Sequence, residues 1–460
     1  MQPISDEDLA IVQRSGLFDP DWYRVTYPDV AASGLTSEHH YLRYGFRLGR
    51  NPGPTFSSRY YRHAFASIIK DQEPISALAR RQQQAGSVPL PDKGRVLLAA
   101  HQSFLSGEHD LALNLAGRHL EAEHRHTLHI LQANAATLSA NRAGWAEAVS
   151  SYLRHFGMDP ISAPDNALSL FEALEPVSTP DPVHDGPRIS VIMPVRNAAL
   201  SLEKAVRSIL AQSWQNLELI AVDDSSEDDS WRILQALTEE DPRLKLHHLP
   251  VNAGPYVARN IALGVVSGDW ITCHDADDWA HPQRLAKHMA AVQAEHTSPC
   301  VSLTYMARMR LNGFFDTIVN ANPFSPDGVT RLSSVSALYR ADFLKEKLGY
   351  WDTVRVGADS EMIARAERVS GSEALTFPQI GMLCLSTEQG LTRHPVLGVR
   401  PKGHLSEIRA AYKDCWSAAH SRRTPEQLYL PFPQHTRRYQ GDFGFEIPYE
   451  IVVKAHQAHV

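Results

Sequence analysis

The most constraining feature of this 460-residue chain is a regular alternation of short apolar runs with helix-patterned segments between residues 189 and 273. An apolar run of four to eight residues suits a buried strand, and apolar residues at three- and four-residue steps suit a helix. Connections this short require right-handed crossovers between parallel strands, so the pattern predicts a doubly wound α/β sheet. The predicted strands are 189–193, 217–222, 244–249 and 270–273, and the predicted helices are 198–212, 230–237 and 256–265.

The first 172 residues have a different pattern and predict helices only. In residues 1–88, Asp19-Pro20 and Ser57-Ser58 each precede a bulky apolar pair, which predicts two helix starts. The aromatic residues there either fill a small core or form a surface for a protein partner. In residues 89–172, Leu105 recurs as Leu138 and Ala112 as Ala146, close to the 34-residue period of tetratricopeptide repeats, which this region weakly resembles.

The remaining boundaries follow from composition. Residues 173–187 hold four prolines without an apolar period, so we expect an extended linker. Residues 188–395 then form the main α/β domain, and residues 396–460 a C-terminal helix, 405–418, with a tail. A cluster of histidines, His124, His126 and His129, is interpreted as plain surface residues and not as a metal site.

Charge and cysteine usage exclude several classes of protein. The chain has 45 Lys plus Arg against 52 Asp plus Glu, a net charge of −7, so a nucleic-acid partner is not expected. Four scattered cysteines without a C-x-x-C pair indicate a reducing compartment. Acidic residues interrupt residues 1–17, and no apolar run approaches the roughly 20 residues of a membrane span. We therefore expect a cytoplasmic protein, with at most peripheral contact with an inner membrane.

Acidic clusters follow two of the predicted strands. Asp223-Asp224 follows the second strand, and Asp275-Ala276-Asp277-Asp278 follows the fourth. Ligands of such sheets bind beyond the carboxyl ends of the strands. Carboxylates at a phosphate site imply a divalent cation, and Mg²⁺ or Mn²⁺ prefers oxygen ligands. The alternative is that Asp277 and Asp278 only begin the helix after Pro282.

Five successive segments resemble the motifs of family 2 glycosyltransferases, which have the GT-A fold. These segments are Pro187 to Asn197, Ser208 to Trp214, Glu218 to Ser226, Asn252 to Asn260 and Asp275 to Trp279. The resemblance covers about two hundred residues and implies a mostly parallel GT-A sheet preceded by an all-α region. It implies an inverting, hexosyltransferase-type enzyme that uses Mn²⁺ or Mg²⁺ to move a sugar from a nucleotide diphosphate, with UDP expected, to an acceptor hydroxyl.

The resemblance also assigns roles to individual residues. Asp277 would be the main metal ligand of the DxD motif, and His394, beside Arg393, is a second candidate ligand. Asp223 or Asp224 would accept the N–H of the base, and Arg259 would sit near the pyrophosphate or brace the acidic loop. The remaining residues expected at the nucleotide sugar are Pro194, Val195, Arg196, Asn197, Asp275 and Ala276.

The reaction also needs a base that takes the proton of the acceptor. By resemblance this is Asp359, although Ala358 stands where relatives often have a second acid, and Asp359 alone could instead be a helix cap with Glu361 in the first turn. Trp351 is interpreted either as a stacking platform for the acceptor or as a core residue. The C-terminal helix is expected to pack over the acceptor site.

Partners and rival functions complete the prediction. The acceptor is expected to be a glycan or a lipid-linked molecule in bacterial surface polysaccharide assembly. One alternative is a non-catalytic sugar-nucleotide-binding scaffold that recruits a protein partner through its N-terminal helices. A sugar-phosphate nucleotidyltransferase is the other, but the first loop, Pro194 to Asn197, lacks the glycines that it needs.

Overall fold

The computed structural model describes residues 4–165, 169–297, 299–387, 390, 394–398, 405–439, 441, 444 and 446–458. It divides into two compact units. The first, which we call the helical unit, comprises Met1–Tyr152 and Thr317–Val329; the second, the sheet unit, comprises Leu153–Asp316 and Thr330–Val460. No helix in the described part of the chain is both long enough and apolar enough to cross a membrane.

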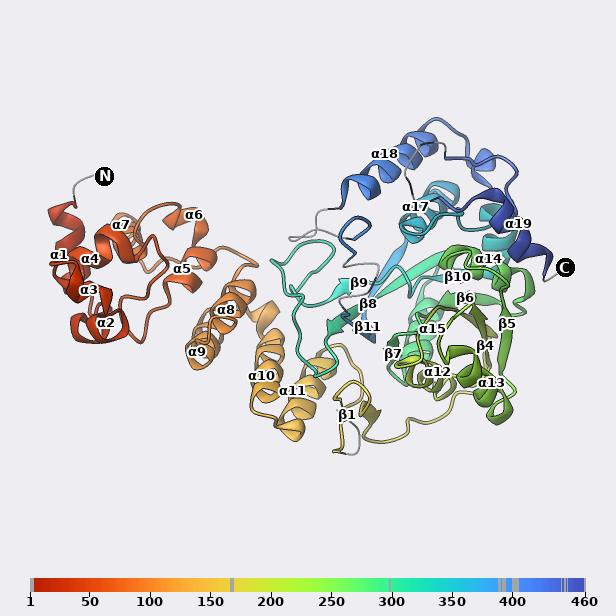
Figure 1. The fold of residues 1–460 in the computed structure, drawn as a ribbon, viewed down its shortest axis with the longest axis horizontal. Helices are drawn as coiled ribbons and strands as arrows, with labels where there is room; N and C mark the ends of the chain where they lie inside the picture. The colour runs from red at the N-terminus through yellow and green to blue at the C-terminus, as the bar shows by residue number, and fades with distance from the viewer. Residues whose placement is uncertain are drawn as a thin grey trace. The chain divides into compact units, whose positions relative to one another are not determined.

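The helical unit confirms the predicted all-α region as far as residue 152 (Figure 1). Residues 153–172, predicted to be helical as well, belong to the sheet unit and include the short strand Ile161–Ser162. Asp19 and Ser57 cap the second and fifth helices, as their positions predicted. Tyr23, Tyr41 and Phe56 are buried in one cluster, which confirms that aromatics fill a core. The helices are α1 (Asp6–Arg14), α2 (Pro20–Thr26), α3 (Asp29–Ala32), α4 (Ser37–His40), η1 (Tyr41–Gly45), α5 (Ser58–Ala64), α6 (Ala66–Ile69), α7 (Pro74–Ala85), α8 (Val96–Phe104), α9 (His109–His119), η2 (Ala122–Thr127), α10 (Leu128–Leu138) and α11 (Arg142–His155).

Two expectations for this unit need correction. Leu105 and Leu138 are 57% and 55% exposed, so their 33-residue spacing marks equivalent helix ends and not packed repeat positions. His124 and His126 are not plain surface residues, because each contacts the segment 317–329. His124 Nε2 lies 3.0 Å from the carbonyl oxygen of Pro326, and His126 Nε2 lies 3.0 Å from a carboxylate oxygen of Asp327. Residues 317–329, predicted within the α/β domain, therefore belong to the helical unit.

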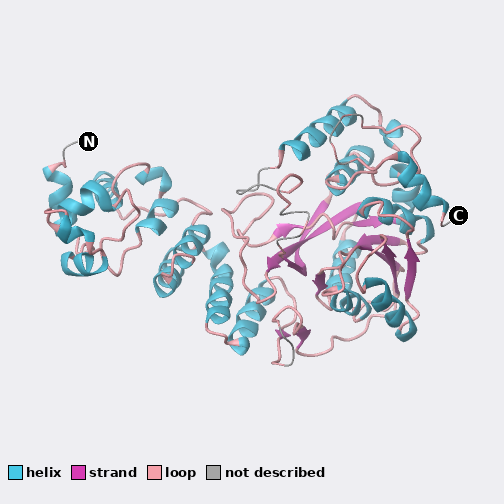
Figure 2. Ribbon diagram, viewed as in Figure 1, coloured by secondary structure: helices cyan, strands magenta, loops and turns pink. Residues whose placement is uncertain are grey.

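The sheet unit confirms the predicted α/β class, with helices on both sides of a central sheet (Figure 2). The strand order is β5-β4-β3-β6-β10-β8-β11-β7, and β9 pairs with β8. The first four strands in this order, β5, β4, β3 and β6, are parallel to one another, as the crossover argument requires. Antiparallel pairs join β10 to both β6 and β8, and β7 to β11, so the far half of the sheet is mixed.

The strands and helices predicted between residues 189 and 273 lie within a few residues of the observed ones, and the sheet unit contains further elements that were not predicted. The strands are β1 (Ile161–Ser162), β2 (Glu175–Pro176), β3 (Ile189–Val195), β4 (Leu217–Asp223), β5 (Leu244–His248), β6 (Trp270–Cys273), β7 (Asp278–Ala280), β8 (Val301–Met309), β9 (Arg331–Leu332), β10 (Leu338–Arg340) and β11 (Leu375–Leu385). The helices are α12 (Leu202–Leu210), α13 (Ser230–Glu240), α14 (Pro255–Val265), α15 (Arg284–Ala294), α16 (Ala341–Phe343), η3 (Leu344–Leu348), α17 (Ala358–Ser370), α18 (Glu407–Ser421), η5 (Pro425–Leu428) and α19 (Tyr449–Gln457).

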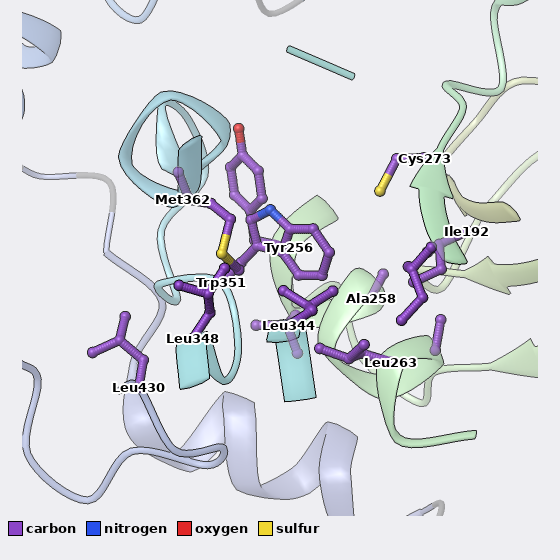
Figure 3. Close-up of a cluster of buried hydrophobic side chains, with 14 of the residues drawn as sticks. Ile192, Tyr256, Ala258, Leu263, Cys273, Leu344, Leu348, Trp351, Met362 and Leu430 are labelled. Atoms are coloured by element: carbon purple, nitrogen blue, oxygen red, sulfur yellow. The ribbon is translucent and has the colours of Figure 1, made fainter. Parts of the chain in front are cut away.

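Alternate residues of the buried strands supply two separate cores. Val191 packs on the face covered by α12, α13 and α15, whereas Ile192 packs on the face covered by α14 and α17. This period of two is the reason why the strands are apolar throughout. Trp351 lies in the second core with Met362 and is 1% exposed, which confirms its core interpretation over a stacking role (Figure 3).

Candidate active site

The ends of β3 and β4 are tied together by side chains from both loops. The Arg196 guanidinium donates to the carbonyl oxygens of Asp224, at 2.8 Å, and of Ser225. Asn197, which has a φ of 48°, donates its backbone N–H to Ser226 Oγ and accepts from the Glu227 N–H. Arg196 therefore holds the β4 loop in place, while Pro194 and Val195 end the strand beside it.

Two adjacent carboxylates after β4 have different surroundings. Asp224 is 2% exposed and accepts the backbone N–H groups of Ala253, at 2.6 Å, and Gly254, at 2.8 Å. Burial raises the pKa of Asp224 to about 6, against the lowering effect of these N–H groups. Asp223 accepts from Ser226 and His248 on one oxygen, while its other oxygen is buried without a hydrogen bond among the described residues. Of the two, Asp223 retains an unused acceptor.

A buried arginine on α14 joins the two parts of the predicted site. Arg259 is 3% exposed, and its guanidinium donates to Asp275 Oδ1 at 2.9 Å and to Asp359 Oδ1. Tyr256, one turn earlier, donates its hydroxyl to the other oxygen of Asp359 at 2.9 Å. The structure thus connects the acidic loop after β6 to the start of α17 through Arg259, whose contact with Asp275 fits one of the two roles expected for it.

Three carboxylates gather where β6 ends and β7 begins. Oxygens of Asp275, Asp277 and Asp278 all lie within 4.8 Å of one another. Burial and the charge of Asp275 raise the pKa of Asp277 to about 6, and the Arg308 guanidinium partly opposes them. Burial, together with its two acidic neighbours, also raises the pKa of Asp278. Like charges this close repel one another, and a divalent cation with oxygen ligands would offset the repulsion.

The helix-start alternative for the acidic loop is wrong. The helix after Pro282 begins at Arg284, with Gln283 at its N-cap. Asp278 instead begins β7, and its Oδ1 accepts the Leu385 N–H at 3.0 Å. Ala276 between the acids is buried, and its carbonyl oxygen accepts from Ser201.

Asp359 lies in the first turn of α17 and does not cap it. The N-cap is Gly357, which has a φ of 87° and no side-chain cap bond. A side chain there would be strained, and its Cβ would lie 3.3 Å from the ring of Tyr412 on α18. The cap interpretation is therefore wrong, and the Asp359 carboxylate faces Tyr256 and Arg259. Burial raises the pKa of Asp359, and the nearby Arg259 opposes that shift.

The predicted second metal ligand does not join the acidic group. His394 is exposed, and its Nδ1 accepts the backbone N–H groups of Val396 and Leu397 at 3.2 and 3.1 Å. Among the described residues, the metal-binding group contains Asp275, Asp277 and Asp278. Arg393 lies outside the described residues, and a ligand role for His394 stays a prediction.

Three site residues were not found from the sequence. Tyr256 stands three residues before Arg259, a spacing that places both on one helix face and could have indicated it. Arg308 lies on β8, a strand that the sequence analysis did not predict. Arg409 lies in the first turn of α18, where burial lowers its pKa and the negative charge of Asp359 opposes that shift. No local pattern marks Arg308 or Arg409.

Part of the chain is similar in sequence to known glycosyltransferases. The model of Glycosyl transferase family 2 matches residues 190–324. An uncharacterized glycosyltransferase of Haemophilus influenzae is 44% identical over 110 residues, which are 24% of this chain and 44% of that protein. The succinoglycan biosynthesis protein ExoO of Rhizobium meliloti is 33% identical over 115 residues, 25% of this chain and 32% of that protein.

The matched segment is similar to family 2 glycosyltransferases, and it contains Asp223, Arg259 and Asp277. The chain spans less than half the length of the two curated relatives. Among solved structures, the mannosyltransferase PcManGT from Pyrobaculum calidifontis, in complex with GDP-Man and Mn²⁺, is 22% identical with a TM-score of 0.36, covering 72% of this chain and 81% of that one. A TM-score this low supports no inference about function.

Proposed function

We propose that this protein is an inverting, metal-dependent glycosyltransferase that moves a hexosyl unit from a nucleotide diphosphate, with UDP the expected nucleotide, to an acceptor hydroxyl. The observation that carries the proposal is the chain of contacts from the acidic group through Arg259 to Asp359. Arg259 contacts both the acidic group, whose carboxylates suit a cation, and Asp359, whose carboxylate suits the acceptance of a proton.

In the proposed reaction, the acceptor oxygen attacks the anomeric carbon while the bond from that carbon to the diphosphate oxygen breaks. Asp359 takes the proton of the acceptor hydroxyl, and the diphosphate leaves with the bonding electrons. Because burial raises the pKa of Asp359, its carboxylate is a stronger base than an exposed one. Arg259 and Tyr256 hold both of its oxygens in place.

The residues present fit a divalent ion. Asp275, Asp277 and Asp278 would hold Mn²⁺ or Mg²⁺, which when bound would stabilise the negative charge that develops on the departing diphosphate. Asp223 is the better of the two candidates for the N–H of the base, because its Oδ1 has no hydrogen bond among the described residues, whereas both oxygens of Asp224 accept backbone N–H groups. An acceptor for an imide N–H suits uracil or thymine.

The setting is also part of the proposal. Curated relatives include a polysaccharide biosynthesis protein, which supports a glycan or lipid-linked acceptor. Tyr412 of α18 packs on Gly357, and the charge of Asp359 acts on Arg409, so we place the acceptor beside α18. We also propose a cytoplasmic location with at most peripheral contact with the inner membrane. The helical unit is the part of the chain proposed to recruit a protein partner.

A panel of UDP-, GDP- and TDP-sugars, assayed for hydrolysis with Mn²⁺ and with EDTA, tests the proposal. We expect Mn²⁺-dependent release of UDP that is lost in Asp277→Asn and retained in Asp342→Asn, an exposed acid paired with Arg340. Binding of UDP without turnover of any donor would favour the non-catalytic scaffold. A preference for nucleoside triphosphates would favour a nucleotidyltransferase.

A further inference from the structure

Four arginines line a hollow beyond the C-terminal end of α18. One cavity of about 470 Å³ is lined by Arg423, Thr436, Arg437 and Arg438. A second, of about 460 Å³, is lined by Cys415, Ala418, Ala419, Arg422, Arg423 and Arg438. Because Arg423 and Arg438 line both, the cavities are neighbouring parts of one space. We call it the arginine hollow and define it by Arg422, Arg423, Arg437 and Arg438.

Two of the four guanidinium groups are fixed by the surrounding fold. Arg437 donates to Asp352 Oδ2 at 2.8 Å and pairs with Glu446 at 3.4 Å. Arg438 donates to the carbonyl oxygens of Gln427 at 2.8 Å and Tyr429 at 3.2 Å. Fixed donors lose little conformational freedom when a ligand binds, which favours affinity.

The other two arginines leave positive charge uncompensated. Within the described part of the chain, Arg422 and Arg423 have no hydrogen-bond or ion-pair partner through their side chains. The charges of Arg437 and Arg423 act on Cys415, which places both beside the same helix face. Among the described residues, the ion pairs of these four arginines involve two carboxylates, Asp352 and Glu446, although the chain as a whole carries −7. Such a concentration of positive charge favours an anion.

The arginine hollow is separate from the nucleotide-sugar site. Arg409 lies near the start of α18, close enough to Asp359 for the charge of that carboxylate to affect its pKa. The helix ends at Ser421, and Arg423 lies two residues beyond that end. Twelve residues of helix between 409 and 421 correspond to roughly 18 Å at 1.5 Å per residue. A ligand in the hollow would therefore not contact the acidic group after β6.

We propose that the arginine hollow binds a phosphate group at a second site, distinct from that of the donor. Planar guanidinium groups match two oxygens of a phosphate at once, and a phosphate monoester carries about −1.5 to −2 at pH 7. That charge balances the two uncompensated arginines. Cavities of this size fall within the range of small-molecule sites. The phosphate belongs either to a lipid headgroup or to a soluble phosphate compound.

The test uses the full chain with the Asp277→Asn substitution in EDTA, which removes metal-dependent binding at the donor site. One arm measures binding of inorganic pyrophosphate by calorimetry. The other measures co-sedimentation with vesicles of phosphatidylcholine containing phosphatidylglycerol, against pure phosphatidylcholine. Arg423→Glu reverses the charge of a side chain that the fold does not use, and Lys413→Glu makes the same change at an exposed position of α18 outside the hollow.

We expect Arg423→Glu to weaken binding at least about tenfold and Lys413→Glu less than about twofold. Arg422→Ala should give a smaller loss in the same direction, and thermal melting of each variant verifies the fold. Binding of pyrophosphate identifies a soluble phosphate compound, whereas binding confined to anionic vesicles identifies a lipid headgroup. Failure of both probes to bind, or equal losses in Arg423→Glu and Lys413→Glu, would overturn the proposal. Neither outcome depends on transferase activity.

Discussion

Strand β4 carries buried carboxylates at both ends, and their surroundings differ. Near its amino end, Glu218 accepts from Lys245 and Ser190, each at 2.6 Å, and from Ser267 at 2.7 Å. Although burial alone would raise the pKa of Glu218, these donors lower it to about 2. At the carboxyl end, burial raises the pKa of Asp224 to about 6, and burial also raises the pKa values of Asp277 and Asp278 at the same edge.

This difference in surroundings distinguishes Glu218, whose role is structural, from the acids at the other edge, which suit a ligand. Glu218 has its counter-ions within the chain, so its charge is stabilised in the folded protein. The acids after β6 repel one another, and although Asp275 pairs with Arg259, neither Asp277 nor Asp278 forms an ion pair within the described part of the chain. Buried charges without partners are costly, and they persist mainly where function uses them. We call the edge with Glu218 the structural edge, and the edge with the acids after β6, to which we assign the proposed chemistry, the chemical edge.

The largest expected effect is on the chemical edge. Asp359→Asn removes the proton acceptor while preserving shape, and we expect turnover to fall by about 10²- to 10⁴-fold. Steady-state assays with the donor identified by the panel measure this, and KM for the donor should change little. The control Asp342→Asn removes an exposed acid and should retain full turnover. Unchanged turnover in Asp359→Asn would remove Asp359 from the mechanism.

The next effect is on the structural edge. Glu218→Gln leaves Lys245 and Arg188 without their counter-charge, and we expect the free energy of unfolding at pH 7 to fall by about 2 to 3 kcal/mol. Because the folded pKa is lowered, the contribution of Glu218 is full above pH 4.5 and is lost as the pH falls toward 2. Urea unfolding measures the loss. Turnover per folded molecule should stay at the wild-type value; a catalytic defect with normal stability would reverse the assignment of the two edges.

The smallest expected effect is the shift in melting temperature that Mn²⁺ causes, and it should depend on pH. The pKa of Asp277 is raised to about 6, so its contribution to stability is full below its ordinary value of 3.8 and is lost as the pH rises through about 6. A bound cation should reverse that loss. We expect Mn²⁺ to raise the melting temperature by about 3 to 6 °C at pH 8 and by almost nothing at pH 5. An equal shift at both pH values would mean that Mn²⁺ binds elsewhere.

Much of the parallel half of the sheet could be predicted from the sequence. Its signals are local, because the apolar runs ending at Val195 and Asp223 and the helices between them each carry their own periodicity. The acidic loop was found for the same reason, since strand ends in such a sheet meet at one edge. Arg259 was placed through the family resemblance, and the structure supplies its two partners.

The mixed half of the sheet could not be predicted, because its pairings join distant segments. Strand β8 pairs with β11, more than seventy residues later, and neither carries a clear alternation. Arg308 was missed with its strand. His126 was misjudged because its partner, Asp327, lies 201 residues away. Contacts of this range leave no trace in local patterns.

Calorimetry of UDP binding with and without Mn²⁺ tests the central claim most directly, namely that the acids after β6 hold a cation that grips a nucleotide diphosphate. In the wild-type chain we predict that Mn²⁺ tightens UDP binding at least about tenfold, and that Asp277→Asn abolishes this gain while Asp342→Asn retains it. An equal gain in wild type and Asp277→Asn, or no gain in wild type, would contradict the claim.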